Sequence, residues 1–578
     1  SLSFWIKGQG TNSASALVVE GYDGSNWVTV HTITNSLPTT GTVYTYNASS
    51  SPALPSSLIQ FRFTYNKNVG NLAFDDVDID YGVLTPSYVP GYQDMTVNGL
   101  SQIVTGVTPC STAYYYRVRA VSPTSTSGNS NVITQHPALQ QFRSAGSGPW
   151  NATATWEQYN GTAWIPATSF PGQGMNDCVS PNVTIRSGHV VVFPATLTYE
   201  GDVVVESGST LDLADGQVLT LTAGSSLLVQ GTLSMAPAAV IDGSGSFTLA
   251  GGAEMRIGSP NGIAVAGASG HIQVTGTRTF ASGANYLYNG TANQLTGTGL
   301  SQNIPGNLTI NNPGNTVSLT ASTVISGNLF IQQGSLDANN QDLTLAGSWI
   351  NNGTFVPGTA TVTFNGSNPV TFGPEVFHHL NIQGSGIKSA TGALLIGGSL
   401  SISGHFQAGS FEHTINGDWI NNGTFTPGTS NIVFANNAAD QIIGGSATSG
   451  FYGLEVMKGS IDRVLEVTGP ISINATVANS LIITSGTFKL SHPSVIAPFW
   501  SGPQATIPVN GCFWNNGGTV LGDNFSWFVY GMFRHTAGVL NIGNSPGNSL
   551  RYFTGSSILI EGGIMNIAAR ISREELFP

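Results

Sequence analysis

Apolar and polar residues alternate over short runs in the first eighty residues, which is the pattern of half-buried β-strands. The segment Gly21–Ser25 between two of these runs favours turn geometry, as a β-hairpin requires. No stretch of a dozen residues repeats apolar positions with the period of an α-helix. We therefore predict an all-β protein that begins with a β-sandwich at residues 1–82. The predicted strands are Leu2–Lys7, Ala16–Tyr22, Trp27–Thr32, Thr42–Asn47 and Leu58–Tyr65.

A different pattern fills residues 182–578, where runs of three or four alternating apolar residues are separated by Gly, Asn or Ser. Clear examples are Asp202–Leu211 and Leu219–Val229. Strands that recur this densely with no helix between them indicate a solenoid. We expect a long right-handed parallel β-helix, in which successive coils pair at about 4.8 Å and inward side chains stack into one core. At that pitch the rod would be on the order of 80 Å long.

One segment of the solenoid region occurs twice almost unchanged. Trp349–Thr359 reads WINNGTFVPGT, and Trp419–Thr429 reads WINNGTFTPGT, 70 residues later. Each copy is followed by a similar strand, Thr361–Phe364 and Asn431–Phe434. With coils of roughly twenty residues or slightly more, this spacing predicts that one repeat covers three coils.

Residues 83–138 contain the run AYYYRVRAV at Ala113–Val121. This run resembles the closing half of a fibronectin type III domain, which implies about seven strands over roughly 90 to 100 residues. The segment is much shorter than that. Either the domain is truncated, or residues are missing near Gly82–Pro86. We favour the second explanation, because half a sandwich would leave an open apolar face.

Residues 139–181 contain three tryptophans, Trp150, Trp156 and Trp164. Together with the following VTIRSGHVVVF, this segment resembles the start of a parallel β-helix in large secreted proteins of Bacteroidota. The resemblance implies that the three rings cover the first coil, which needs a cap for solubility. A sugar-stacking aromatic platform is the alternative.

Composition narrows the possible functions. Only 8% of the residues are charged, and Gly fills 73 positions. The net charge is −12 with only 17 Lys and Arg, so there is no basic surface for nucleic-acid phosphates. No run of 18 apolar residues predicts a membrane-spanning helix. The chain begins at Ser1 without a charged-then-apolar leader, so we expect a signal peptide that is removed or lies outside this fragment.

The three cysteines, Cys110, Cys178 and Cys512, lie far apart and lack the spacing of a metal site. We expect them to be buried small apolar residues. A Cys110–Cys178 disulfide, formed in an oxidising compartment, is the alternative.

The segments SLSFWIKG, VEGYDGSNW and FRFTYNKNVGNLAFDDVDI resemble the jelly-roll, carbohydrate-binding-like modules of large secreted Bacteroidota proteins. The resemblance implies a structural calcium, a cation that the carboxylates of Asp75, Asp76 and Asp78 would suit. Strand alternation places Asp76, Asp78 and Asp80 on one face. A solvated acidic edge strand that discourages aggregation is the alternative.

Tyr22 and Trp27 in the same module are candidate glycan-binding residues. Aromatic rings next to an uncharged Ser, Thr, Asn and Gly surface can bind neutral glycans. The alternative is that both rings belong to the core of the sandwich.

Parallel β-helices include polysaccharide lyases and hydrolases, which need a base with a cation or a pair of carboxylates. Residues 201–400 contain only twelve Asp, Glu, Lys and Arg, most of them single. The densest acidic group, within Asp202–Asp215, has no basic partner nearby and is interpreted as a solvated corner. The pair His378–His379 has no further ligand at metal spacing. We therefore predict no enzyme activity and no catalytic residue.

The whole layout resembles large secreted Bacteroidota proteins of the gliding or surface-adhesion type, which the type IX secretion system exports. This resemblance implies an extracellular or cell-surface protein. Its expected partners are surface glycans, other cell-surface proteins, the secretion machinery or further copies of itself. The expected function is a non-catalytic structural or adhesive stalk or fibre segment. A carbohydrate-active β-helix enzyme and a self-assembling filament subunit are the alternatives. Ionisable side chains clustered along one face of the solenoid would favour the enzyme.

Overall fold

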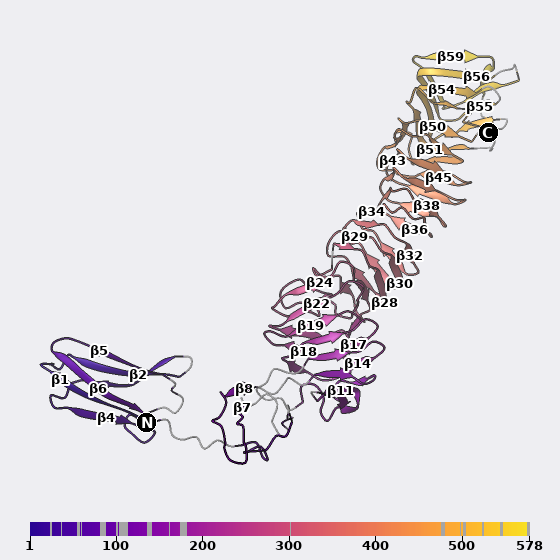
Figure 1. The fold of residues 1–578 in the computed structure, drawn as a ribbon. Helices are drawn as coiled ribbons and strands as arrows, with labels where there is room; N and C mark the ends of the chain where they lie inside the picture. Colours follow the sequence, from indigo (N-terminus) through magenta and orange to yellow (C-terminus); the bar gives the residue numbers. More distant parts are fainter. Residues whose placement is uncertain are drawn as a thin grey trace. The chain divides into compact units, whose positions relative to one another are not determined.

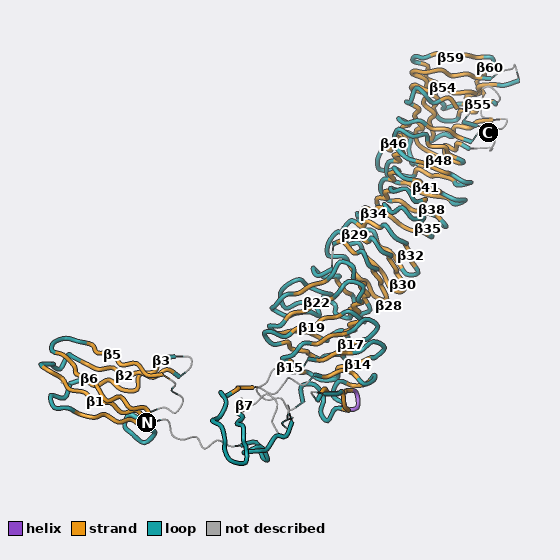
Figure 2. The backbone as a smooth tube through the Cα atoms, in the orientation of Figure 1, coloured by secondary structure: helices purple, strands orange, loops and turns teal. Residues whose placement is uncertain are grey.

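The computed structural model describes most of the chain as β-strands joined by turns (Figure 2). Its contacts divide the chain into two units, Ser1–Val107 and Thr108–Pro578. No helix among the described residues is long and apolar enough to span a membrane. The expectations on Gly82–Pro86 and on Cys110 and Cys178 lie outside the described residues. The residues not described are 24–25, 36, 55–57, 59, 81–87, 100–101, 103, 105–113, 136–140, 161, 174–181, 301, 475–479, 498, 501–503, 523–524, 544–546 and 575–578.

Six strands build the first unit: β1 (Leu2–Gln9), β2 (Ala16–Tyr22), β3 (Trp27–Ile33), β4 (Thr42–Tyr46), β5 (Gln60–Asn66) and β6 (Asn71–Ile79). They form two antiparallel sheets, in the orders β4–β1–β6 and β3–β2–β5. Alternate side chains such as Phe4, Val19 and Ile33 are buried in one apolar core. The all-β prediction and the N-terminal antiparallel sheets are confirmed.

A short antiparallel pair follows, formed by β7 (Tyr114–Tyr116) and β8 (Ile133–Gln135). Strand β7 ends at Tyr116, so the AYYYRVRAV run is not a strand as far as Val121. Val118 and Val121 are 72% and 71% exposed, so neither side chain gains the burial that would extend the strand. The fibronectin type III assignment therefore stays a prediction.

A parallel β-solenoid of about 17 turns follows, and β13 (Val183–Ile185) is one of its first strands. Its strands pair in register with the strand one coil later, so that Val183 lies beside Val203 and Val203 beside Leu227. These side chains are fully buried, and the residues between them face outward. The inward columns merge into one core that runs from Phe142 to Leu550. The predicted parallel β-helix is thereby confirmed, and Figure 1 shows its strands stacked coil upon coil.

An antiparallel ribbon covers the first coil. It consists of β9 (Phe142–Ser144), β11 (Trp156–Tyr159) and β12 (Trp164–Pro166), and β9 then pairs in parallel with β13. Trp150 and Trp156 are buried with their ring centroids 5.1 Å apart. Trp156 Nε1 donates to the Trp150 carbonyl over 2.7 Å, and Trp150 Nε1 donates to the Pro171 carbonyl over 2.9 Å. Trp150 and Trp156 are thus buried at the start of the core, while Trp164 lies partly exposed on the ribbon, and the capping role of the three rings stays a prediction.

The two copies of the WINNGTF repeat lie on different faces of the solenoid. In one coil, β31 (Leu343–Leu345) is followed directly by β32 (Trp349–Asn351). Trp349 pairs with Leu329, whereas Trp419 in β43 (Trp419–Asn421) belongs to the column of Leu343. That column reads Leu343, Val362, Leu380, Leu400 and Trp419. Four coils therefore separate Leu343 from Trp419, and the expectation that one repeat covers three coils is wrong.

A ladder of side-chain hydrogen bonds runs along one corner of the solenoid. Asn285 Oδ1 accepts from the backbone N–H of Asn307, and Asn307 Oδ1 accepts from that of Asn328. Asn328 Oδ1 accepts in turn from the N–H of Ser348. Each side chain so satisfies a backbone donor of the next coil where the chain turns.

Candidate functional site

The predicted glycan-binding residues meet on the outer face of the sheet β3–β2–β5. Tyr22 lies directly opposite Trp27 in the β2–β3 pair, and their ring centroids are 5.4 Å apart. Both point outward because Leu17, Val19 and Gly21 occupy the inward positions of β2. Trp27 is 38% exposed, so it is not a core residue. The structure thus brings the two predicted residues together at the surface.

Arg62 completes this group, which we call the aromatic platform (Tyr22, Trp27, Arg62 and Glu20). The Arg62 guanidinium lies 4.3 Å from the centroid of the Trp27 ring. Its Nε and Nη2 each donate to Glu20 over 2.8 Å. The hydrogen bonds from Arg62 lower the pKa of Glu20 below its usual value. The sequence pattern did not single out Arg62 and Glu20, although both occupy outward positions of alternating strands.

The predicted calcium residues lie on β6, where a β-bulge changes their arrangement. Asp78 pairs with Ser3 and Asp75 pairs with Trp5, so three steps along β6 match two along β1. Asp76 has a positive φ of 51°, as a bulge residue often has. The bulge places Asp75 and Asp78 on one outer face, in place of the face expected for Asp76, Asp78 and Asp80. No group of three His, Cys, Asp or Glu among the described residues could hold a metal ion. The calcium site stays a prediction, which calcium titration of the folded chain tests.

A row of charged and aromatic side chains lies on the outer face of the C-terminal coils. It runs through β49 (Val464–Val467), β51 (Leu481–Leu490), β54 (Gly511–Gly522) and β56 (Met532–Ile542). Glu466, Lys489, Trp514 and Arg534 occupy the same register position in these four strands. The Lys489 ammonium and the Arg534 guanidinium lie 4.5 and 4.1 Å from the centroid of the Trp514 ring. Two cations therefore flank this ring, where a sugar would otherwise stack.

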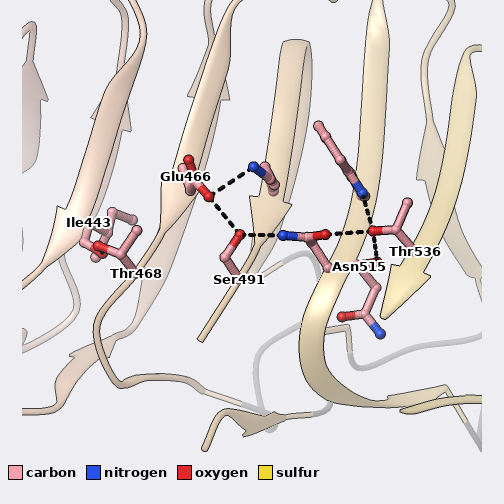
Figure 3. Close-up of polar contacts among 9 residues, drawn as sticks. Ile443, Glu466, Thr468, Ser491, Asn515 and Thr536 are labelled. Carbon is pink, nitrogen blue, oxygen red and sulfur yellow. Dashed lines mark hydrogen bonds and ion pairs between the residues drawn. The ribbon is translucent and has the colours of Figure 1, made fainter. Parts of the chain in front are cut away.

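Hydrogen bonds tie this row to the next outward positions (Figure 3). Glu466 Oε1 accepts from Ser491 over 2.7 Å and pairs with Lys489 over 2.9 Å. Ser491 Oγ accepts from Asn516 over 3.1 Å, and Asn516 accepts from Thr536 over 2.6 Å. Trp514 Nε1 donates to Thr536 over 2.8 Å. The network joins four coils and holds their outer surface in one arrangement.

A shallow hollow of about 350 Å³ opens beside this row. Asp418 and Asp440 line it, but each of them accepts a backbone N–H of the next coil, from Ile442 over 2.9 Å and from Val464 over 2.8 Å. Burial alone would raise the pKa of Glu466, yet its contacts with Ser491 and Lys489 hold that pKa below its usual value. The carboxylates of the hollow thus have structural partners. The hollow is lined by Asp418, Asp440, Gln441, Ile442, Val464, Glu466, Lys489 and Trp514.

Two lysines and one glutamate are buried inside the solenoid, which the sequence did not indicate. Lys388 Nζ donates to the carbonyls of Gly366 and Gly386 over 2.9 and 2.8 Å. Lys458 Nζ donates to Gln441 Oε1 over 2.7 Å, and burial lowers its pKa to about 8. These cations satisfy polar groups at internal corners. They are enclosed, so we assign them structural roles.

Glu375 in β36 (Glu375–Phe377) accepts hydrogen bonds from Trp349 Nε1 over 2.8 Å and from Asn351 Nδ2 over 3.0 Å. In the second copy of the repeat, Ser449 accepts from Trp419 and Asn421 in the same way. Burial raises the pKa of Glu375 above its usual value. Ionisation of this carboxyl therefore costs stability, which should fall as the pH rises from about 4.5 through the raised pKa.

Replacing Glu375 by glutamine is expected to destabilise the solenoid by about 1–3 kcal/mol, because the amide N–H₂ would take the place of Oε2, which accepts from Asn351 Nδ2 over 3.1 Å, and would face that donor. The Asn351 amide cannot reverse to accept from it, since its Oδ1 already accepts the N–H of Gly353 over 3.0 Å. Urea unfolding at pH 4.5, where ionisation of Glu375 does not yet cost stability, measures the change, with the exposed Glu412→Gln as control. An unchanged midpoint for Glu375→Gln would contradict this prediction.

The remaining candidate residues do not assemble into a site. His378 and His379 are in ring contact, and His379 Nδ1 accepts the N–H of Ser399 over 3.0 Å. Glu206 and Asp202, from the acidic group near the first coils, accept from Ser187 and Ser226. Cys512 is buried, as expected, and burial raises the pKa of its thiol to about 11.

No protein-family model matches the chain, and neither a curated protein nor a solved structure matches it.

Proposed function

We propose that this chain is a non-catalytic extracellular protein, in which the solenoid is a rigid stalk and the sandwich binds uncharged glycans. The observation that best supports this proposal is the unbroken apolar core from Phe142 to Leu550. In such a stack each coil packs only on its neighbours, and dense packing resists deformation. About 17 coils at about 4.8 Å give a stalk on the order of 80 Å long.

The proposed setting follows from resemblance to large secreted Bacteroidota surface proteins of the adhesion type. It comprises a position outside the cell or on its surface and export by type IX secretion machinery. The proposed partners are surface glycans or other cell-surface proteins. Detection of the native protein on intact cells by surface labelling tests this setting, and its restriction to the cytoplasmic fraction would overturn it.

The aromatic platform is the proposed glycan-binding surface. Its rings offer apolar faces, while the Arg62–Glu20 pair offers a donor and an acceptor side by side. Sugar hydroxyl groups both donate and accept, so this combination suits an uncharged ligand.

Trp27→Ala is expected to weaken glycan binding by the full chain at least tenfold, because Trp27 is the most exposed ring of the platform. Binding is measured on an array of neutral oligosaccharides. Trp5→Ala is the matched control, since Trp5 faces outward on the other sheet and is also partly exposed. Equal binding by both variants would remove the platform from the proposal.

A carbohydrate-active enzyme is the second candidate function. The observation that favours it is the hollow in which Asp418, Asp440 and Glu466 gather. A hydrolase needs one carboxylic acid that keeps its proton near neutral pH, whereas the contacts of Glu466 favour its ionised form. Release of reducing ends from polysaccharides by the purified chain, lost in Asp440→Asn, would replace the first proposal by this one.

A further inference from the structure

A second hollow, of about 250 Å³, lies on the outer face of the first coil, over β9 and β13. We call it the first-coil groove. Arg143 and Thr184 point into it because their strand neighbours Phe142, Ser144, Val183 and Ile185 are buried. The volume is below the roughly 300–1,000 Å³ of pockets for drug-sized ligands, so it suits a single small unit. The groove is lined by Gln141, Phe142, Arg143, Trp164, Asn182, Thr184, Arg186 and Glu206.

Two arginines of the groove have N–H groups without a hydrogen-bond acceptor among the described residues. Arg143 Nε donates to Glu157 over 2.6 Å, and its guanidinium lies 4.3 Å from the centroid of the Trp164 ring. Arg186 Nη1 lies 3.8 Å from the same carboxylate, a distance too long for a hydrogen bond. Within the described part of the chain, the Arg186 guanidinium has no other polar partner. Arg278, by contrast, donates hydrogen bonds from Nε, Nη1 and Nη2 to backbone carbonyls.

Acceptors lie beside these donors. Glu206 uses Oε2 for the N–H of Ser187, which leaves Oε1 without a partner among the described residues. Asn182 uses Oδ1 for the N–H of Asp202, which leaves its Nδ2 donor. Glu206 lines the groove, and Glu157 lies beside the groove against Arg143, so these two carboxylates together offset the charges of Arg143 and Arg186. An anion would meet the Glu206 carboxylate in the groove and arginines whose charge is already balanced, whereas an uncharged polyol would not be repelled.

We propose that the first-coil groove binds one unit of an uncharged glycan through adjacent hydroxyl groups. Arg186 and Asn182 donate to the hydroxyl oxygens, and Glu206 accepts from a hydroxyl. Glu157 holds the Arg143 guanidinium in place before binding, which reduces the ordering that the ligand must impose. This second site rests on the proposed function, because it would bind the same class of ligand as the aromatic platform.

The test uses the full chain carrying Trp27→Ala, so that the aromatic platform does not contribute. Cellohexaose, mannohexaose and xylohexaose are the probes, and titration calorimetry measures their binding. Arg186→Gln is expected to raise the Kd at least tenfold. Arg256→Gln is the matched control, because Arg256 is a similarly exposed arginine on the outer face, 46% against 44%. Hydrogen exchange should show ligand protection at Phe142–Ser144 and Val183–Ile185.

The following outcomes would overturn the groove or the choice of an uncharged ligand. Binding in the wild-type chain that Trp27→Ala abolishes would overturn the groove and leave the platform standing. Equal losses from Arg186→Gln and Arg256→Gln would also overturn the groove. Binding of hexagalacturonate in preference to all three neutral probes would overturn the choice of an uncharged ligand. If the wild-type chain binds none of the probes, both the groove and the proposed glycan binding fail.

Discussion

Replacing Trp150 by alanine is expected to destabilise the first coils of the solenoid by about 3–5 kcal/mol. The Trp150 ring is only 2% exposed and lies at the centre of an aromatic cluster. Its centroid is 5.1 Å from that of Trp156, 5.2 Å from Phe193 and 5.8 Å from Tyr199. Alanine would leave a cavity at the end of the stack and would also leave the Pro171 carbonyl without its donor. Unfolding should then begin at this end and spread coil by coil.

Hydrogen exchange monitored by mass spectrometry separates this local effect from a global one. Amides of residues 142–205 should lose protection, while those of residues 329–434 keep it. Trp164→Ala is the control, because this ring is partly exposed and lies outside the cluster, and we expect a change of at most about 1 kcal/mol. Equal loss of protection along the whole solenoid would show that Trp150 is not a local cap.

The alternating pattern was sufficient to predict the sandwich and the solenoid, because one face of each strand is buried. It could not predict where the coils turn. Leu343 and Trp349 are close in sequence and belong to one coil, but they lie on different faces of the solenoid. The number of residues at each corner varies, so the sequence shows no fixed period from which the corners could be placed. The near-identical repeats therefore indicated a solenoid correctly and the number of coils wrongly.

Alternation also failed locally at Asp76. Because β6 has one extra residue at the bulge, the residues before the bulge point to the opposite side from the one that simple alternation predicts. Asp75 and Asp78 therefore lie on the same outer face. A bulge depends on pairing with β1, which lies at the other end of the sandwich sequence, and the local pattern of β6 carries no trace of it.

The candidate sites were predictable in part. Tyr22 and Trp27 flank a short hairpin turn, so their proximity follows from the sequence. Glu466, Lys489, Trp514 and Arg534 come together only because successive coils stack in register. Their recurrence at nearly regular intervals, at outward positions, was a signal that could have been found. The first-coil groove could not be inferred, since it depends on an antiparallel ribbon joining a parallel sheet.

His271 is expected to make the solenoid acid-sensitive between pH 6.5 and about 4. The ring is fully buried between Ala239 and Ser259: Nδ1 lies 2.7 Å from the Ala239 carbonyl, and Nε2 accepts the N–H of Ser259 over 2.7 Å. Burial lowers the pKa of His271 from 6.5 to about 4, although the hydrogen bond to Ala239 opposes the shift. The unfolded chain therefore binds the proton more readily than the folded one.

Stability linked to His271 is complete above pH 6.5 and declines as the pH falls toward 4, by about 3 kcal/mol at roughly 1.4 kcal/mol per pKa unit. His271→Gln should lose this dependence, because an amide can satisfy both partners without titrating. Urea unfolding at pH 7, 5.5 and 4 measures it, with His405→Gln on the outer surface as control. The wild-type and His405→Gln chains should lose about 3 kcal/mol more than His271→Gln over this range. Parallel pH profiles for the wild-type and His271→Gln chains would mean that the acid sensitivity resides elsewhere, since these two chains differ only at residue 271.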